Sequence, residues 1–560
     1  MSSPPAKAPE SDVFARLWQS FADSLLAPFA PNPRATAITV AGIGALALLL
    51  VLSPGLYITD KPLDLFIPLD GALRMSQGQW PHADFYSPIG SGYYVMLGLA
   101  AALMGIGPKV VMWASVLLAP LMGGACWVLS RDRLPTPLRL AMLTYVTVLV
   151  FSPRTLGTPL ISYLASYNKH GWATVAIVML GLLLIPRKRD QRTAIVEGVV
   201  LAALTVLAFY LKITYFALCG FVILFAFVFM PAQRWVALGA GTGALGTLAL
   251  SSLISSHNAL YIADLQRAGA SMNEGVRFDR LVPIFTANQA ALVGFVAFAI
   301  WLLRSSRDEA EEQTASTDLM VIIAMLGVTL LIASQSHDHD IPVLPVLGLA
   351  CFTALRQRLH RREESGTGGI HLVGAVVLAM LAAPVGQDVL AIGMHAAGTR
   401  SGAQLVRGAD GPLSQIRVPQ GQGPTFLGRV VEGSLPLEVY DSLSDANWHI
   451  DTGPILSDAM GLIDKHNAAD KRIVSLTFSP LFSWIYRSPA PRHQAAWLDH
   501  ERTFSQSSAG DLSILFDEVD VVMQPKVWET PMLWETYGPT IEGQFERKGE
   551  TALWVIWVRR

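Results

Sequence analysis

The stretch that decides the fold is Tyr57–Tyr94, YITDKPLDLFIPLDGALRMSQGQWPHADFYSPIGSGYY. It follows an apolar run at 37–56, which is long enough to cross a bilayer because a spanning helix needs roughly 20 mostly apolar residues. The stretch begins with the spacing of an amphipathic helix and continues with glycine, proline and aromatic residues. It carries four aspartates, at positions 60, 64, 70 and 84. Carboxylates beside aromatic side chains at a membrane surface indicate a site that acts on a molecule from the lipid phase.

The composition is that of a membrane protein with many spans. Of 560 residues, 52% are hydrophobic and only 15% are charged, and the mean hydropathy is +0.42. The net charge of −2 provides no general basic field, so nucleic acid is not expected as a partner. The three cysteines all lie in apolar runs without metal spacing, and we expect inert thiols rather than disulfides.

Apolar runs that can form membrane helices recur up to about residue 390. They lie near 37–56, 88–106, 109–130, 138–152, 171–185, 194–211, 213–230, 235–255, 287–303, 318–334, 341–355 and 370–387. Beyond residue 109, strongly basic short loops such as Pro186–Arg192 alternate with loops that are not basic. Basic loops mark the cytoplasmic face, which places the N-terminus inside and the C-terminus outside.

This orientation leaves no crossing for the 88–106 run, which we interpret as a juxtamembrane or re-entrant helix. The alternative is that this run crosses normally and another helix is misassigned. We therefore predict a polytopic α-helical membrane protein with about 11 transmembrane helices and a C-terminal extracytoplasmic α/β domain. The expected location is the inner membrane of the cell, with a periplasmic C-terminal domain.

Four segments follow from this interpretation. Residues 1–36 form a cytoplasmic segment with an interfacial amphipathic helix, and residues 37–390 form the transmembrane domain, whose first outer loop is 57–108. Residues 391–439 are rich in glycine, serine and proline and are predicted to be a linker. Short strand and helix patterns alternate in residues 440–560, which predicts an α/β domain.

Three aspartates of the first outer loop are candidates for catalysis. Asp64 lies at the start of the amphipathic helix, close to the outer membrane surface, and is the leading candidate for a general base. Asp70 lies six residues further on, so the two carboxylates face different sides of one helix. Asp84 is the third candidate. For each aspartate the alternative is a helix cap or a solvated surface position.

A cation and a polar cluster in other outer segments are candidates for substrate binding. Lys212 lies in FYLKITYF between two apolar runs, where an ionisable residue indicates function and a cation suits a lipid phosphate. Tyr167, Asn168 and Lys169 lie where a helix re-enters the membrane, and Lys169 is equally suited to extend toward a lipid headgroup.

Two further outer loops carry candidate substrate-binding residues, and for each loop there is an alternative without a binding role or with a different ligand. Arginines bind phosphate in a bidentate manner, but an ordinary solvated loop also contains several of them. The arginines in question are Arg267, Arg277 and Arg280. The motif SQSHDHDIP contributes His337, Asp338 and His339. Two histidines at this spacing can bind a metal, yet no third ligand is identifiable, so a polar cavity lining is favoured. No cofactor is certain, and the sequence leaves open a divalent metal.

The motif LDLFIPLDGALRMSQGQWPHADFYSPIG resembles the first outer loop of the GT-C glycosyltransferases, among them the bacterial protein O-mannosyltransferases and aminoarabinose transferases. In that class an acidic residue begins the loop, a helix follows, and a glycine–proline–aromatic segment leads into the next helix. Asp64, Gly78, Trp80 and Pro81 occupy those places. The class often has adjacent acidic residues, whereas Leu65 follows Asp64 here, which keeps Asp70 as an alternative equivalent.

The resemblance implies an enzyme that uses a polyprenyl-phosphate-linked sugar donor and an extracytoplasmic acceptor, a glycan, lipid or protein, in contact with membrane lipids. A lipid-linked glycan polymerase or ligase is the nearest alternative. A non-enzymatic transporter or flippase is a different class, and it favours ionisable residues at mid-membrane. Most charges here lie at the outer interface, which favours the enzyme. No Walker loop, HExxH or GxSxG motif is present, so nucleotide-driven transport and triad hydrolysis are unsupported.

Overall fold

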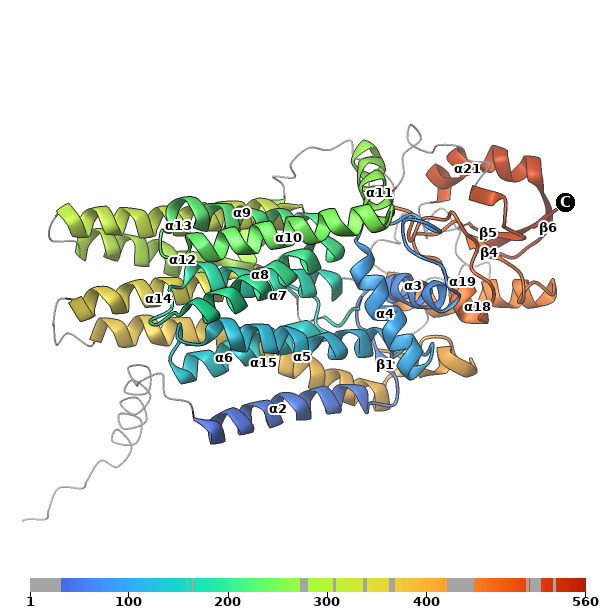
Figure 1. The fold of residues 1–560 in the computed structure, drawn as a ribbon. Coiled ribbons are helices and arrows are strands. Elements are labelled where there is room, and N and C mark those ends of the chain that lie inside the picture. The colour runs from blue at the N-terminus through green and yellow to red at the C-terminus, as the bar shows by residue number, and fades with distance from the viewer. Residues whose placement is uncertain are drawn as a thin grey trace, which may run out of the picture.

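The protein is a long bundle of helices that carries a smaller α/β region at one end (Figure 1). The computed structural model describes residues 32–158, 160–163, 166–271, 280–305, 309–335, 340–361, 368–420, 448–499, 503, 515–526 and 530–560. The predicted amphipathic helix near the N-terminus and residues 421–439 of the predicted linker lie outside these ranges.

The helices of the bundle lie side by side along its length (Figure 1). They are α2 (Pro33–Val51), α5 (Val110–Ser130), α6 (Thr136–Phe151), α7 (Ser166–Leu183), α8 (Gln191–Leu211), α9 (Ile213–Phe229), α10 (Arg234–Ile254), α12 (Leu281–Ser305), α13 (Glu309–Ser334), α14 (Leu344–Arg361) and α15 (Gly368–Ser401). Among the described residues, six helices are long and apolar enough to cross a membrane, and shorter apolar helices accompany them. The prediction of a multi-pass α-helical membrane protein is confirmed.

The first outer loop does not contain a full-length membrane helix. Its apolar run forms α4 (Ser91–Met104), which has 14 residues and is shorter than the roughly 20 that a spanning helix needs. The helices α3 (Phe66–Ser76), α4 and α11 (His257–Ser271) all lie at the end of the bundle that carries the C-terminal region (Figure 1). That this run does not cross the bilayer stays a prediction.

Two small sheets lie at the same end. The first has the order β1-β3-β2, from β1 (Leu56–Tyr57), β2 (Ala403–Gln404) and β3 (Ile416–Val418), with η3 (Gly411–Gln415) between the last two in sequence. Because β1 directly follows α2 and pairs in parallel with β3, the chain after α15 is tied to the start of the first outer loop. The predicted linker therefore begins inside α15, which continues to Ser401, and goes on as paired strands.

The C-terminal region is the predicted α/β domain, and its presence is confirmed. Its sheet has the order β4-β5-β7-β6, with one parallel pair between β4 and β5 and antiparallel pairs elsewhere. The strands are β4 (Ile473–Ser475), β5 (Val521–Pro525), β6 (Phe545–Glu550) and β7 (Trp554–Arg559), and the helices are α18 (Trp448–Lys465), α19 (Phe482–Tyr486) and α21 (Thr530–Gln544).

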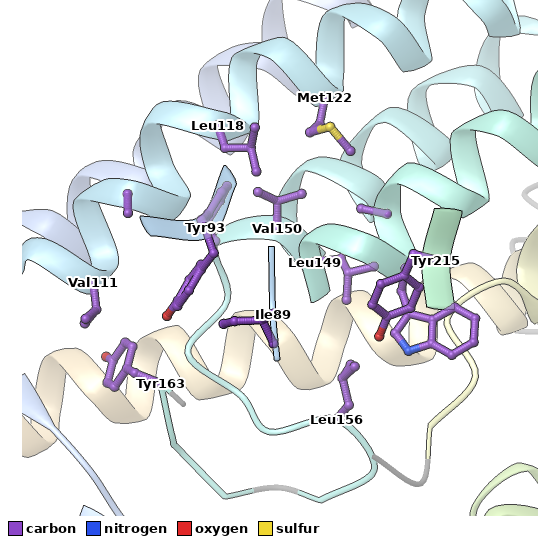
Figure 2. Close-up of a cluster of buried hydrophobic side chains, with 14 of the residues drawn as sticks. Ile89, Tyr93, Val111, Leu118, Met122, Leu149, Val150, Leu156, Tyr163 and Tyr215 are labelled. Atoms are coloured by element: carbon purple, nitrogen blue, oxygen red, sulfur yellow. The ribbon is translucent and has the colours of Figure 1, made fainter. Parts of the chain in front are cut away.

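The core of the bundle continues into the outer loops. Figure 2 shows Ile89, Tyr93 and Leu156 of the outer segments beside Leu118 and Val150 of the membrane helices. All five are buried, with at most 3% of each side chain exposed. The outer loops are therefore packed parts of the fold, held by apolar burial of roughly 25 cal/mol per Å².

At the other end of the bundle, two of the basic loops share one buried ion pair. The Arg133 guanidinium donates to both carboxylate oxygens of Glu197 on α8, at 2.5 and 3.0 Å, and these side chains are 0% and 2% exposed. Arg189 from the next basic loop reaches the same carboxylate at 2.9 Å. The basic residues that indicate orientation thus also fasten α5, α7 and α8 together.

We predict that Glu197→Ala lowers the free energy of unfolding by about 3–5 kcal/mol, because it leaves the Arg133 cation buried without its partner. Thermal denaturation of the purified protein in detergent measures the loss. The double variant Arg133→Met with Glu197→Met removes both charges and should recover most of the stability. A single variant as stable as the unmodified chain would contradict this reading of the pair.

Candidate functional site

Asp64 lies in a short 3-10 helix, η1 (Pro62–Leu65), between β1 and α3. The preceding Lys61 adopts a left-handed conformation with φ 46°, and the Asp64 amide donates to its carbonyl oxygen at 3.1 Å. This turn directs the carboxyl group inward, and the residue is only 5% exposed. Among the residues that the structure describes, no side chain or backbone group donates a hydrogen bond to this carboxylate.

The electrostatic setting of Asp64 suits a proton acceptor at neutral pH. Burial raises its carboxyl pKa from 3.8 to about 7; the Lys61 cation opposes the rise, and the carboxylates of Asp60 and Asp499 add to it. Asp499 belongs to the C-terminal domain, so both the first outer loop and that domain set the charge around Asp64. A carboxyl group with a pKa near the working pH is well matched to general-base chemistry.

Asp70 has a structural partner. It lies on α3 with 1% of the residue exposed, and the Arg74 guanidinium one turn later donates to its carboxylate at 2.5 Å. Arg74 also donates to the side-chain oxygen of Gln79 at 3.0 Å and to the backbone oxygen of Pro491 at 2.7 Å. Asp70 therefore holds the arginine that fastens the first outer loop to the C-terminal domain.

Asp84 also has partners that shape the loop. Its carboxylate accepts a hydrogen bond from the Trp80 amide at 2.7 Å and lies 3.6 Å from the Arg492 guanidinium. Its carbonyl oxygen accepts from the His493 amide at 2.6 Å. Of the three predicted carboxylates, Asp64 is thus the one without a hydrogen-bond donor in the described part of the chain.

The structure brings together three of the predicted binding residues. Lys212 is in an extended conformation between α8 and α9, and its Nζ lies 3.4 Å from the side-chain oxygen of Asn168. The same ammonium lies 5.6 Å from the ring centre of Tyr167 and 5.9 Å from that of Tyr215. The Tyr215 hydroxyl donates to Asn168 at 3.1 Å. The sequence analysis did not single out Tyr215, which lies three residues after Lys212 in the first turn of α9.

The break between α8 and α9 is held open by the first outer loop. The Gly90 amide donates to the Leu211 carbonyl at 3.0 Å. A Cβ on Gly90 or Gly92 would come within 2.3 or 2.8 Å of the Tyr210 carbonyl oxygen, so only glycine permits this approach. The start of α4 therefore lies directly on the backbone that presents Lys212.

Lys169 has a different position. It is 3% exposed, and its Nζ donates to the carbonyl oxygens of Ser152 and Arg154, the latter at 3.2 Å. Ser152 is the C-cap of α6, so the cation lies where a helix end favours positive charge. The Lys169 ammonium therefore neutralises carbonyl oxygens at the end of α6.

A buried charge network beside α6 was not predicted. The Arg154 guanidinium lies 2.7 Å from Asp388 of α15 and 3.3 Å from Asp340. Asp388 is 1% exposed and also accepts from the Ser152 hydroxyl at 2.9 Å. The signal was visible in the sequence, because Asp388 is an acid at the edge of an apolar run.

The helix α11 was also missed as a partner of the first outer loop. Its Asp264 accepts from the Ser87 amide at 3.0 Å and lies 2.8 Å from Nδ1 of His82. The His82 ring lies 4.6 Å from the Tyr261 ring, and the Tyr261 hydroxyl accepts from the Ile213 amide at 3.2 Å. One face of α11 therefore connects the outer loop with the helix break next to Lys212.

Of the remaining predicted site residues, the structure describes Arg267 and Arg280. Arg267 lies on α11, with its guanidinium 4.7 Å from the centre of the Tyr86 ring. Arg280 is half-buried at the start of the segment that leads into α12. Arg277, His337, Asp338 and His339 lie outside the described residues. Within the described part of the chain, no group of three histidine, cysteine or acidic side chains is close enough to hold a metal ion.

No family model and no curated protein matches the sequence. Two solved structures are similar, both of ArnT from Cupriavidus metallidurans. The apo structure is 12% identical, over 93% of this chain and 97% of that chain, with a TM-score of 0.48. The structure bound to undecaprenyl phosphate is 12% identical, over 94% and 98%, with a TM-score of 0.46. ArnT is a GT-C aminoarabinose transferase, the class that the first outer loop resembles. At this identity the likeness assigns no role to any residue.

The raised pKa of Asp64 predicts a pH-dependent stability difference for Asp64→Asn. The folded chain binds this proton more tightly than the unfolded chain, so the charged carboxylate destabilises the fold as the pH rises from about 4 to about 7. Three pKa units correspond to about 4 kcal/mol at most. We expect Asp64→Asn to unfold at a higher temperature than the unmodified chain at pH 8, and the difference to shrink toward pH 4.

Thermal denaturation in detergent at several pH values checks this expectation. Asp84→Asn is the matched control, because its carboxylate is paired with a partly exposed arginine. A stability difference for Asp64→Asn that stays constant between pH 4 and pH 8 would show that the carboxyl group is not held in an unfavourable charged state.

Proposed function

We propose that the protein is a membrane glycosyltransferase, which moves a sugar from a polyprenyl-phosphate-linked donor to an extracytoplasmic acceptor with Asp64 as the general base. The observation that carries the proposal is the burial of Asp64 at the outer end of the bundle, with a pKa of about 7 and no hydrogen-bond donor among the described residues. A carboxylate in such a position is costly for stability, which is typical of a functional group.

The proposed reaction is a single displacement at the anomeric carbon. Asp64 accepts the proton of the acceptor hydroxyl while that oxygen forms a bond to the anomeric carbon. The bond between this carbon and the phosphate oxygen breaks, and the polyprenyl phosphate leaves with the electron pair. Lys212 stabilises the negative charge of the leaving phosphate, and Asn168 and Tyr167 position the ammonium group.

The arrangement of the loops supports an orientation with the site outside the cytoplasm. The connection between α5 and α6, which contains Arg133, and the connection between α7 and α8, which contains Arg189, lie at the end of the bundle opposite the C-terminal domain (Figure 1). Basic loops remain on the cytoplasmic side. We therefore propose an inner-membrane protein with a cytoplasmic N-terminus, a transmembrane domain at 37–390 and a periplasmic domain at 440–560. In this orientation the donor enters from the outer leaflet.

We expect Asp64→Asn to lower the rate of sugar transfer by about 10²–10⁴-fold, the range that general-base assistance usually contributes. The measurement is transfer of a radiolabelled sugar from a polyprenyl-phosphate donor by purified protein in detergent. The variant should remain folded, because the amide replaces the carboxyl group without a change of shape.

Asp84→Asn provides the control for this experiment. The amide oxygen can still accept from the Trp80 amide, and only an ion pair with a half-exposed arginine is lost, worth about 0–1 kcal/mol. Its activity should stay within a few-fold of the unmodified chain. Near-normal transfer by Asp64→Asn would overturn the assignment of the base.

A further inference from the structure

A narrow crevice lies where the first outer loop, α11 and the C-terminal domain meet. The loop contributes Tyr86, and α11 contributes Arg267. The domain contributes Gln494, Leu498 and Tyr537, among other residues. The enclosed space is narrow, with room for little more than a water-sized group, and it opens to solvent at its mouth. Residues distant in the sequence thus form a hollow around one arginine.

Arg267 is a cation without an ionic partner in the described part of the chain. Its guanidinium lies 4.7 Å from the centre of the Tyr86 ring and forms no hydrogen bond or ion pair with a described residue. Asp264, one turn earlier on α11, is already engaged by His82 and the Ser87 amide. An arginine in a partly enclosed crevice presents a planar fork of donors that fits an oxyanion.

Tyr86 supplies a second, independent indication of a ligand. The residue is 5% exposed, and its buried hydroxyl has no hydrogen-bond partner among the described residues. Such a group is costly to bury and usually marks a place where a partner binds. Burial raises the pKa of this hydroxyl, so it keeps its proton and can donate.

The opposite wall adds to the same chemistry. Tyr537 of α21 also lines the crevice. Burial raises the pKa of its hydroxyl to about 12, and the Arg267 cation opposes this rise. Leu498 and Phe516 supply apolar surface beside these polar groups. The crevice therefore combines one guanidinium with phenolic hydroxyl groups in a partly dry setting, where charge-assisted hydrogen bonds are strong.

We propose that this crevice binds a single oxyanion, a carboxylate or phosphate group of the acceptor substrate. Arg267 forms the ion pair, and the Tyr86 hydroxyl donates a hydrogen bond to the same group. The proposal of an oxyanion site is based on the residues that line the crevice. The proposal that the oxyanion belongs to the acceptor substrate also rests on the proposed glycosyl transfer. A donor phosphate is held separately at Lys212, where the Tyr261 hydroxyl of α11 meets the helix break.

The binding test uses full-length protein in detergent with Lys212→Gln, so that the proposed donor site does not contribute. Inorganic phosphate and acetate are the probes, and sodium chloride at equal ionic strength is the reference. Phosphate or acetate should raise the unfolding temperature in a saturable manner. Adding Arg267→Gln should weaken this binding at least about tenfold, and Tyr86→Phe about tenfold, because each removes a donor to a charged group.

Two variants separate the site from general charge effects. Arg267→Lys keeps the cation and should retain part of the binding, and Arg492→Gln removes a half-exposed arginine outside the crevice and should change nothing. The oxyanion site is overturned if neither probe gives more than chloride does, or if Arg267→Gln binds both as before.

The acceptor assignment has its own readout. In the sugar-transfer assay, Arg267→Gln should raise KM for the acceptor about tenfold while KM for the donor stays unchanged. An unchanged acceptor KM would overturn this assignment even if the probes bind. Normal transfer by Asp64→Asn would instead overturn the general base and leave the oxyanion site standing, so the two failures are distinguishable.

Discussion

The contact on which the site depends is the hydrogen bonding of Arg74 across the boundary between the bundle and the C-terminal domain. The guanidinium is held by Asp70 on its own helix and donates to Gln79 and to the Pro491 carbonyl. Neighbouring bonds continue the seam, since the Gln79 amide group donates to the Ala490 carbonyl at 2.6 Å. These bonds fasten the first outer loop, which contains the buried Asp64, to the C-terminal domain.

Burial raises the pKa of both the Asp70 and the Asp64 carboxyl group, but the two carboxylates have different neighbours. Asp70 is deeply buried, and the Arg74 guanidinium within hydrogen-bond distance opposes the rise of its pKa. For Asp64 burial is the main cause of the raised pKa; the Lys61 cation opposes it, and the carboxylates of Asp60 and of Asp499 in the C-terminal domain add to it. The domain is therefore more than a cover, because it contributes to the charge that tunes the proposed base. The same domain also lines the crevice around Arg267.

Local patterns in the sequence predicted much of this arrangement. The apolar run lengths predicted the bundle, and the orientation of neighbouring loops predicted that the run containing α4 falls short of a full crossing. The position of Asp64 directly after the first span singled it out, and a lysine between apolar runs singled out Lys212. Each of these inferences depends on residues that are close in the chain. The helical bundle is confirmed, and the roles of Asp64 and Lys212 stay predictions.

Contacts between distant segments could not be predicted in the same way. Asp70 and Asp84 stayed candidates beside Asp64 because the groups that the structure places next to them, Pro491 and Arg492, belong to another domain. The contact of Lys169 with the end of α6 is likewise not visible in the sequence. The periodicity of apolar residues does not predict which helix will supply the ion-pair partner of an arginine such as Arg154.

The pH dependence of kcat/KM for sugar transfer tests the central claim most directly, because it reports the ionisation of the free enzyme. If Asp64 is the base, activity should rise about tenfold per pH unit below its pKa and level off above about pH 7. The residual activity of Asp64→Asn should lack this rise. A profile that is flat between pH 5 and pH 8, or a rise that persists in Asp64→Asn, would contradict the account.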